Sequence, residues 1–461
     1  MMDQNRKILL INASLSPKHK RLSDRVFPHT ALMLLATVLD KAGWNVRILD
    51  GNLHDLASFK QVVYDELTGD TLYIGFSVMT NQIPWAYDVT EYIKSIAPEI
   101  PIVWGGVHPT LYPEQTAADS NVDIVVVNEA LSNTILPLTR ALANHTSLDE
   151  VPGLCYRHND TIVRTQAPSL DRIEDVPFID FSLMDHRHYA AGNVTFNFYP
   201  DDIPAVDNIA YPIVTGLGCP YRCRFCINVI LKRRYRGRSA SEIVDRIEFL
   251  QDQYGANFIW AMDEDFLTNK RRILQFVDLV ERRKLKFYFR AWLRVDHFRD
   301  GYIDVELANR LYNVGLIIAV MGAESGSQRI LNYLNKGITP EQIRRASATL
   351  AQTRIVPRYS FMVGFPDETE QDLAETREMA RRLRDDNPKS DVQILNYCPF
   401  PGSPMYDQIR RDYSLREPES LYAWSRLAES KGYARYFPIE ESTWISNPDQ
   451  VKDLVYTHLY K

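Results

Sequence analysis

The feature that most constrains the fold is an alternation of short apolar strands with helix-length amphipathic segments, which occurs twice along the 461 residues. In residues 1–145 the pattern predicts five strands, at 7–12, 45–50, 72–77, 102–104 and 124–127. It predicts helices between them at 30–42, 58–67, 86–96 and 133–143. β-Branched runs at this spacing are typical of a parallel sheet covered on both faces, so we expect a Rossmann-like, doubly wound domain.

The second alternation covers residues 209–410 and predicts six strand–helix repeats. The expected strands are 213–215, 258–261, 286–290, 316–321, 358–363 and 392–397. The expected helices between them are 240–254, 270–284, 305–314, 340–353 and 370–386. The predicted fold class is therefore α/β, with a partial (β/α)6 barrel as the second domain. A full eight-repeat barrel, which typically needs about 250 residues, is the alternative.

Two segments lie outside these alternations. Residues 146–208 predict a hairpin around Asn159-Asp160 and then a Pro- and Asp-rich stretch, which we interpret as a connector. Residues 411–461 are rich in Tyr, Trp and charge, and we expect a small helical appendage or an active-site cap. A chain of this length, about three times a typical domain of roughly 150 residues, agrees with this division.

Three of the five cysteines fall within eight consecutive residues, at Cys219, Cys223 and Cys226. They follow the expected strand 213–215, and barrel enzymes build their active sites at the carboxyl ends of strands. An odd and uneven set of cysteines is not a disulfide framework and indicates a reducing compartment. The two remaining cysteines, Cys155 and Cys398, are interpreted as bystanders.

Three thiols at this spacing leave several interpretations open. A structural zinc site needs four ligands, and the nearest histidines, His188 and His297, are distant in sequence. An iron–sulfur cluster of the 4Fe–4S type that is held by three cysteines keeps one iron open, as a catalytic cluster requires. The third alternative is a set of buried thiols without metal. We favour the cluster, around which Gly216 and Gly218 let the chain fold tightly.

The segment Cys219-Pro-Tyr-Arg-Cys223-Arg-Phe-Cys226 resembles the signature of the radical S-adenosylmethionine (radical SAM) superfamily. Over roughly residues 210–410 the resemblance extends to motifs at expected strand ends: Asp263-Glu-Asp-Phe266, Gly322-Ala-Glu-Ser-Gly-Ser327, Lys336-Gly-Ile-Thr339, Gly364-Phe-Pro-Asp-Glu-Thr369 and Pro399-Phe-Pro-Gly-Ser-Pro404. These motifs are similar to those of the branch with an N-terminal cobalamin-binding domain. The resemblance implies a 4Fe–4S cluster on the three cysteines, SAM at its open iron, and a 5′-deoxyadenosyl radical.

The resemblance also implies which side chains bind SAM. Asp263 and Glu264 are expected at its amino group, and the alternative is helix capping or a solvated loop. Arg294 is a candidate for the SAM carboxylate, with a barrel salt bridge as the alternative. Hydrogen bonds to the ribose hydroxyls or the methionine carboxylate are expected from Glu324, Ser325 and Ser327. The alternative for these three residues is turn chemistry with a helix N-cap.

Cobalamin is expected at the carboxyl ends of the strands of the first domain, where open parallel sheets bind ligands. The candidates are Ser77, Thr80, Gly105 and Gly106, and the alternative for the two glycines is a tight turn without a ligand. The chain lacks the Asp-x-His-x-x-Gly pattern of cobalt-ligating histidines, which the resemblance does not require. The branch has glycines in the turn after the fifth strand, whereas this chain has Asn128-Glu-Ala-Leu131. The domain therefore either binds cobalamin or is a cobalamin-type scaffold that has lost it.

The net charge of −6 argues against a strongly basic nucleic-acid binder. No apolar window approaches the ~18 residues of a membrane span, and no secretory signal is recognised, so we expect a cytoplasmic protein. The basic run 232–238 is either a site for an electron donor such as flavodoxin or ferredoxin, a site for an anionic substrate, or a solvated loop. His186 and His188 either face the active site or lie on a surface loop.

The leading functional hypothesis is cobalamin-dependent methylation of an unactivated carbon of a small biosynthetic intermediate. The second keeps the radical step without methyl transfer, as in a dehydratase, epimerase or cyclase whose N-terminal domain is a scaffold. A non-catalytic iron–sulfur protein is the third. The strand-end motifs with Asp263, Glu324 and Glu368 argue against this third hypothesis, because an electron carrier does not need them.

Overall fold

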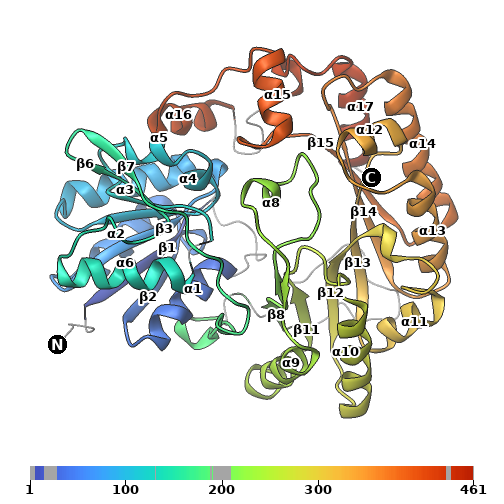
Figure 1. Ribbon diagram of the computed structural model, residues 1–461, viewed down its shortest axis with the longest axis horizontal. Coiled ribbons are helices and arrows are strands. Elements are labelled where there is room, and N and C mark those ends of the chain that lie inside the picture. The colour runs from blue at the N-terminus through green and yellow to red at the C-terminus, as the bar shows by residue number, and fades with distance from the viewer. Residues whose placement is uncertain are drawn as a thin grey trace. The chain divides into compact units, whose positions relative to one another are not determined.

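The computed structural model describes residues 6–14, 29–129, 131–186, 189, 209–431 and 438–459 (Figure 1). The chain forms two compact units, Met1–Tyr189 with Arg416–Tyr436, and Ala190–Leu415 with Phe437–Lys461. The C-terminal region that the sequence analysis treats as one appendage is thus divided between the units. Most of the expected connector after residue 186, including His188, lies outside the described residues.

The first unit contains a seven-stranded sheet in the order β2-β1-β3-β4-β5-β6-β7. Its strands are β1 (Lys7–Asn12), β2 (Asn45–Asp50), β3 (Thr71–Ser77), β4 (Ile102–Gly105), β5 (Ile124–Val126), β6 (Leu154–His158) and β7 (Thr161–Arg164). The first five pair in parallel, whereas β6 and β7 join antiparallel at the edge. β6 and β7 form the hairpin expected in the connector, so this hairpin is part of the sheet. Its residues Leu154, Cys155 and Tyr156 are buried.

Helices cover both faces of this sheet, as its parallel strands require. One apolar core lies beneath α1 (Thr30–Lys41) and α6 (Ser132–Asn144). The opposite core lies beneath α2 (Leu56–Glu66), α3 (Ile83–Ile96), α5 (Pro113–Ala117) and α16 (Leu421–Lys431). The first unit is therefore completed by a helix from near the end of the chain.

Polar contacts hold the segment before α16 to the first unit. The Tyr112 hydroxyl donates to the Glu417 carboxylate at 2.5 Å, and the Gln115 side-chain amide donates to the Pro418 carbonyl at 2.8 Å. Trp424 of α16 is only 2% exposed and packs in the core of this face. The segment around residues 416–424 is thus an integral part of the unit.

The second unit contains a six-stranded parallel sheet in the order β15-β14-β13-β12-β11-β8. Its strands are β8 (Ala210–Ile213), β11 (Phe258–Ala261), β12 (Tyr288–Leu293), β13 (Leu316–Glu324), β14 (Val356–Val363) and β15 (Asp391–Asn396). Its main helices are α9 (Ala240–Tyr254), α10 (Lys270–Arg283), α11 (Val305–Asn313), α13 (Pro340–Ala351), α14 (Glu370–Asp386), α15 (Pro404–Asp412) and α17 (Pro448–Leu459). The six strand–helix repeats confirm the predicted α/β class with a partial (β/α)6 barrel.

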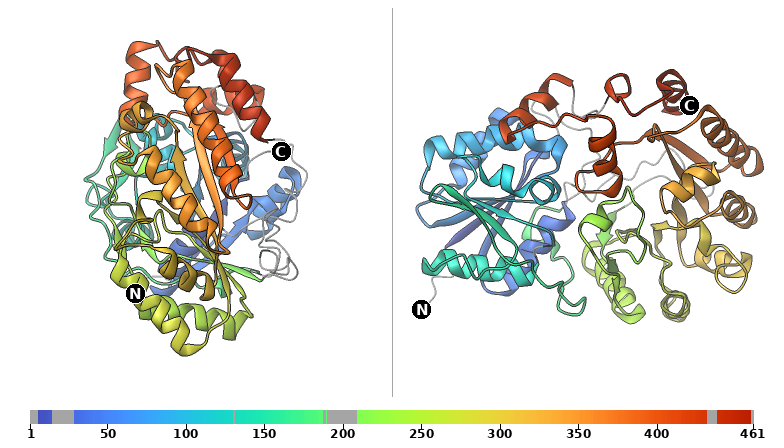
Figure 2. Two further views of the ribbon diagram at one scale, coloured as in Figure 1. Left: turned by 90° about the vertical axis from the view of Figure 1, so that its right-hand side faces the viewer. Right: turned by 45° about the horizontal axis from the view of Figure 1, so that its top comes forward.

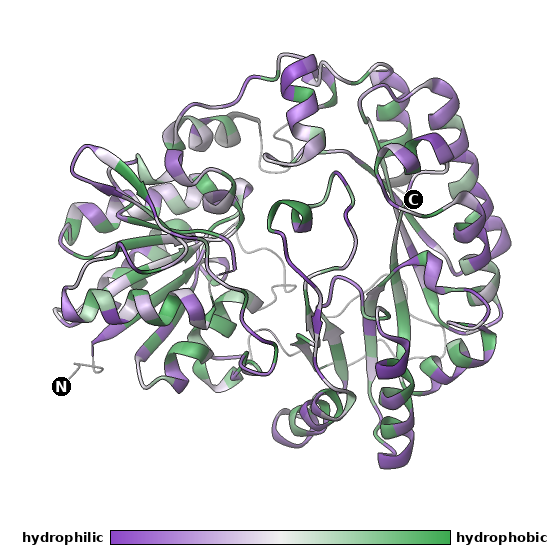
Figure 3. Cartoon of the chain, in the orientation of Figure 1, coloured by the Kyte–Doolittle hydropathy of each residue, from purple (hydrophilic) through white to green (hydrophobic). Residues whose placement is uncertain are grey.

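The helices begin where the sequence supplies caps. Capping boxes start α9, α13 and α14, with the pairs Ser239–Glu242, Thr339–Gln342 and Thr369–Asp372. In Figure 3 the strands are largely hydrophobic and the outer helices carry both colours, as amphipathic helices that cover a sheet should. In the part of the chain that is described, no helix combines the length and the hydrophobicity needed to cross a bilayer.

Candidate active site

The three clustered cysteines lie on a loop at the carboxyl end of β8. The loop is closed at its base by the antiparallel pair β9 (Gly216–Leu217) and β10 (Arg236–Gly237), and α8 (Ile227–Ile230) begins directly after Cys226. Gly218 has a φ of +76°, and a Cβ there would lie 2.4 Å from the Arg234 carbonyl oxygen, so only glycine fits. We call this segment, residues 216–237, the cysteine loop.

The thiols of the cysteine loop fit an iron–sulfur cluster. Cys223 is buried, whereas Cys219 and Cys226 are partly exposed. Burial raises the pKa of the Cys219 thiol to about 11 and also raises the pKa of Cys226, so metal binding must displace their protons. Within the described ranges, no three His, Cys, Asp or Glu side chains form a group suited to a single metal ion. Three thiolate donors on one loop suit a cluster with one open iron.

The cysteine loop is anchored to the segment that follows α12 (Gln328–Tyr333). The Arg224 backbone N–H donates to the Leu334 carbonyl at 2.9 Å, and its guanidinium donates to the Tyr333 carbonyl at 3.1 Å. The Asn335 side-chain amide donates to the Arg222 carbonyl at 2.9 Å. These three hydrogen bonds hold Arg222 and Arg224, the residues on either side of Cys223.

Asp263, expected at the SAM amino group, is 2% exposed and holds the base of the cysteine loop. Its carboxylate accepts hydrogen bonds from the Thr215 backbone N–H at 2.8 Å and the Thr215 hydroxyl at 2.5 Å. Arg272 lies 3.5 Å from the same carboxylate and donates to the Thr215 carbonyl at 3.0 Å. The neighbouring Glu264 is more exposed and lies 3.9 Å from Arg233 of the loop.

Arg294, expected at the SAM carboxylate, forms the salt bridge that the sequence analysis left as its alternative. Its Nε lies 2.9 Å from Asp296, and its Nη2 donates to the Lys336 carbonyl at 2.8 Å. The guanidinium carbon lies 3.5 Å from the centre of the Tyr221 ring, between Cys219 and Cys223 in sequence. Arg294 thus contacts the cysteine loop through the Tyr221 ring. The spacing of the motifs does not indicate this contact.

Glu324 sits at the carboxyl end of β13 in a strained conformation. It is 5% exposed with a φ of +65°, which is rare for a residue other than glycine and typical of functional sites. Its Oε1 lies 2.7 Å from Nζ of the buried Lys336. Lys336 is expected from the sequence only as part of a motif, yet its ammonium lies 6.0 Å from the centre of the Phe225 ring of the cysteine loop.

We predict that Lys336→Met destabilises the second unit by about 3–5 kcal/mol, because it leaves the buried Glu324 carboxylate without its cation. Urea denaturation measures the loss. The double variant Glu324→Gln/Lys336→Met should recover much of this stability without recovering activity. Equal instability of the single and double variants would show that the ion pair is not the cause.

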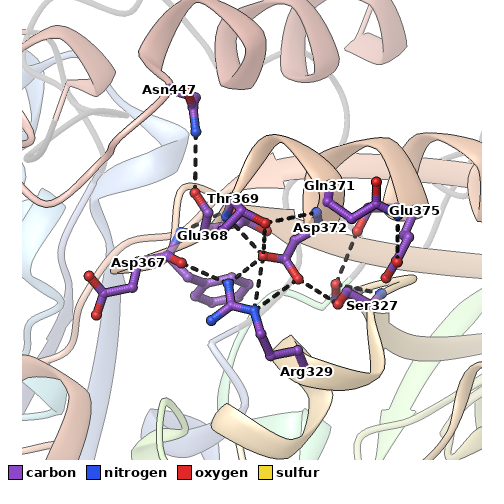
Figure 4. A network of polar contacts seen from close by, with 12 residues as sticks. Ser327, Arg329, Asp367, Glu368, Thr369, Gln371, Asp372, Glu375 and Asn447 are labelled. Atoms are coloured by element: carbon purple, nitrogen blue, oxygen red, sulfur yellow. Dashed lines mark hydrogen bonds and ion pairs between the residues drawn. The ribbon is translucent and has the colours of Figure 1, made fainter.

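The Ser327 hydroxyl points toward Asp372 of α14 (Figure 4), and the Ser325 hydroxyl also contacts this helix. The Ser325 hydroxyl lies 3.0 Å from that of Thr376, and the Ser327 hydroxyl donates to Asp372 at 2.6 Å. Asp372 also accepts from Thr369 and Arg329. Although burial opposes it, these hydrogen bonds hold the pKa of Asp372 well below its usual range. The two serines therefore fasten the turn after β13, although Ser327, the N-cap residue of α12, makes no side-chain capping hydrogen bond. Their expected contact with SAM stays a prediction.

Glu368 lies in a second turn, the one that follows β14. One carboxylate oxygen accepts from the backbone N–H groups of Gly364 at 2.6 Å and Phe365 at 3.2 Å. The other oxygen is buried without a hydrogen-bond partner among the described residues. Burial raises the pKa of Glu368 to about 7, above the ordinary value of 4.5.

This raised pKa predicts a pH dependence of stability. The folded chain binds the Glu368 proton more tightly than the unfolded chain, so the contribution of Glu368 to the free energy of unfolding is greatest below pH 4.5 and is lost as the pH rises to about 7. The expected fall is about 3 kcal/mol. Denaturation at several pH values should show that the difference between wild type and Glu368→Gln varies over this window. A constant difference would contradict the prediction.

The cobalamin candidates lie at the carboxyl edge of the sheet in the first unit. Gly106 has a φ of +101°, and a Cβ there would lie 2.7 Å from the Val78 backbone nitrogen, so the fold itself requires this glycine. A Cβ at Gly105 would meet only ordinary contacts, the nearest at 3.6 Å. The fold does not require Gly105, whose missing side chain leaves room for a ligand. Ser77 lies 3.3 Å from a ring nitrogen of His29.

His108 follows these glycines and is buried against aromatic rings. Its Nδ1 lies 3.3 Å from the Thr80 hydroxyl, and its ring centre lies 5.4 Å from that of Trp424 and 5.1 Å from that of Tyr112. Burial lowers the pKa of His108 to about 3, so the ring is neutral. The cobalamin candidate Thr80 is thus connected to α16 through His108.

Asn128 follows β5, at the turn where the resemblance expects glycines. Asn128 has a φ of +71°, the conformation that a glycine would supply, and its backbone N–H donates to the Thr110 hydroxyl at 3.0 Å. Ala130 lies outside the described residues. The loss of the glycines therefore does not prevent a left-handed backbone conformation at Asn128.

Three further residues named from the sequence lie apart from the cysteine loop. A His186 ring nitrogen lies 3.0 Å from the Phe181 carbonyl oxygen, within the first unit. Cys155 is buried in the core of the same unit, whereas Cys398 is exposed after β15. None of these side chains joins the cysteine loop in a described contact.

Comparison with known proteins gives the class of the two units. Residues 213–380 match the model of the radical SAM superfamily, and residues 24–132 match that of the B12 binding domain. The chain therefore carries a B12-binding domain followed by a radical SAM domain, as the motifs predicted.

Relatives and solved structures carry the same arrangement. An uncharacterized methyltransferase of Pyrococcus horikoshii is 28% identical over 405 residues, 87% of this chain and 82% of the relative. The anaerobic magnesium-protoporphyrin IX monomethyl ester cyclase of Rubrivivax gelatinosus is 28% identical over 83% of this chain and 66% of its own length. TsrM from Kitasatospora setae, a radical SAM methyltransferase solved with cobalamin and a 4Fe–4S cluster, shares the fold at a TM-score of 0.68 and 19% identity, over 88% of this chain and 75% of TsrM.

Proposed function

We propose that this chain is a cobalamin-dependent radical SAM methyltransferase that acts on an unactivated carbon of a small biosynthetic intermediate. One observation carries the proposal: the cysteine loop places three thiol donors at the carboxyl end of a partial barrel, in a chain that also has a B12-binding domain. When bound, the cluster and SAM supply a 5′-deoxyadenosyl radical, and cobalamin supplies methyl-transfer chemistry.

The contacts support distinct roles for the candidate residues. Cys219, Cys223 and Cys226 hold the cluster. Glu324, oriented by Lys336, and the accessible Glu264 are placed to accept hydrogen bonds from SAM. The four remaining SAM candidates act by positioning the cysteine loop and the turn after β13; they are Asp263, Arg294, Ser325 and Ser327. Cobalamin is held at the edge that carries Ser77, Thr80, Gly105 and Gly106.

Each methylation consumes two molecules of SAM and two electrons. One SAM gives S-adenosylhomocysteine, and the other gives methionine and 5′-deoxyadenosine, which takes the hydrogen from the substrate carbon. We infer that a low-potential protein such as flavodoxin or ferredoxin donates the electrons, near the basic run 232–238. A reducing cytoplasm suits the free cysteines and this chemistry.

A radical reaction without methyl transfer is the second candidate. The similarity to the anaerobic cyclase favours it, because that relative is as identical to this chain as the methyltransferase of Pyrococcus horikoshii. In this case the first unit serves as a scaffold.

Anaerobic reconstitution with iron, sulfide and hydroxocobalamin separates the two candidates. After gel filtration, the protein is incubated with SAM and a reductant, and the products are quantified. Methyl transfer predicts that cobalamin is retained and that both S-adenosylhomocysteine and 5′-deoxyadenosine form. Retention of no cobalamin, with 5′-deoxyadenosine as the only nucleoside product, would overturn methyl transfer in favour of the second candidate.

A further inference from the structure

The buried ammonium of Lys336 lies beside the cysteine loop, and backbone contacts hold it there. Its Nζ lies 6.0 Å from the centre of the Phe225 ring, between the second and third cysteines of the loop in sequence. The Lys336 carbonyl accepts a hydrogen bond from the Arg294 guanidinium at 2.8 Å. The preceding residue, Asn335, donates from its side chain to the Arg222 carbonyl at 2.9 Å. The fold therefore fixes this cation close to the three cysteines.

The counter-ion of Lys336 is Glu324, the last residue of β13. Their charged atoms lie 2.7 Å apart, and both side chains are buried. A Cβ at Gly322 of the same strand would lie only 3.0 Å from the Lys336 Nζ, so the missing side chain at Gly322 leaves room for the ammonium. Burying an ion pair is costly and does not by itself stabilise a fold better than apolar packing. A built and buried pair next to the cysteine loop therefore calls for a role beyond stability.

The cation of this pair acts on the thiols more strongly than the anion does. Burial raises the pKa of the Cys226 thiol, whereas Lys336 lowers it and outweighs the opposite effect of Glu324. Although burial opposes it, Glu324 and the Cys223 thiolate raise the pKa of Lys336. A cluster on these cysteines gains one negative charge when it is reduced, and a nearby buried cation, which water screens little, stabilises the reduced form.

We propose that Lys336 sets the reduction potential of the iron–sulfur cluster, because its ammonium stabilises the cluster after it has accepted one electron. The inference rests on the cluster of the proposed function. The electron comes from the external reductant and enters the iron–sulfur core, and no bond to Lys336 forms or breaks. Lys336 is not a ligand of the cluster and acts through its charge alone. Glu324 keeps the ammonium charged and in place, and it weakens the effect in part.

A redox titration of the reconstituted protein, without SAM or cobalamin, tests this role. The protein is poised anaerobically at a series of potentials, and the reduced cluster is quantified from its EPR signal. Glu324→Gln/Lys336→Met lacks both charges, and its ratio of reduced to oxidised cluster at a fixed potential should fall about tenfold, which equals a midpoint potential lower by about 59 mV. Lys336→Met keeps the carboxylate and should lower this ratio further. Lys336→Arg keeps the positive charge and should stay within about threefold of the wild type.

An exposed ion pair of the same unit provides the control. Arg310 of α11 lies 2.6 Å from Glu281 of α10, and the two side chains are 33% and 42% exposed. Figure 2 shows the helices of the second unit along the outside of its sheet, where water screens such a pair. Arg310→Gln should therefore leave the midpoint potential unchanged. If Lys336→Met does not fold, the double variant and Lys336→Arg still decide the question.

Equal midpoint potentials of the wild type and Glu324→Gln/Lys336→Met, with full iron content in both, would overturn the inference. A fall in Lys336→Arg as large as in the double variant would overturn it too, because the charge is then not the cause. Either outcome leaves the cluster and the proposed function intact. The expected potentials in a protein that forms no S-adenosylhomocysteine from SAM would retain the role of Lys336 and remove the proposed methyl transfer.

Discussion

Replacement of Cys223 by alanine is expected to remove the iron–sulfur cluster and with it all cleavage of SAM. Cys223 is 8% exposed, and it is the middle one of the three thiols on the cysteine loop. Two thiols do not hold a cluster that already lacks a fourth protein ligand. Iron and sulfide analysis after anaerobic reconstitution should fall from about four per chain to near zero.

The other cysteines supply the controls for this experiment. Cys398→Ala changes an exposed thiol after β15, and Cys155→Ala changes a buried thiol in the core of the first unit. Both variants should keep their iron. Full iron content and activity in Cys223→Ala would remove the basis for the cluster assignment.

Replacement of Trp424 by alanine is expected to destabilise the first unit by about 3–5 kcal/mol and to release cobalamin. The indole is 2% exposed and packs against His108, which contacts Thr80 at the carboxyl edge of the sheet. Loss of the ring leaves a cavity behind that edge. Hydrogen exchange of β3 and β4 measures the stability, and the absorbance of the gel-filtered protein measures the retained cobalamin.

Tyr422 is the matched control on the same helix. It is 49% exposed, so Tyr422→Ala should change stability by less than about 0.5 kcal/mol and keep cobalamin. Iron content should be normal in both variants, since the cysteine loop belongs to the other unit. Full cobalamin retention by Trp424→Ala would show that α16 has no part in the cobalamin site.

Most elements could be predicted from the sequence because local signals define them. The boundaries differ where local structure depends on distant partners. The first strand of the second sheet ends at Ile213, not at 215, because Thr215 is bound by Asp263 of another strand end. β12 continues to Leu293 rather than ending at 290, and the buried Phe289, Ala291 and Leu293 alternate along it with Arg290 and Trp292. The helix expected at 86–96 begins at Ile83, and Pro84 fits its first turn.

The site could be predicted in part, for the same reason. The spacing of the cysteines is a local signal, and it predicts the three cluster ligands. Arg294 follows β12, whereas Lys336, whose carbonyl accepts its hydrogen bond, follows β13, and only the folded sheet brings these two strand ends together. The contact of Trp424 with His108 joins residues more than 300 positions apart, and no local pattern indicates it.

The production of 5′-deoxyadenosine tests the central claim most directly. The reconstituted wild type is incubated anaerobically with SAM and dithionite, beside Cys223→Ala treated in the same way. The account predicts 5′-deoxyadenosine from the wild type and none from the variant. A wild-type protein that holds its full iron content yet forms no 5′-deoxyadenosine under these conditions would contradict it.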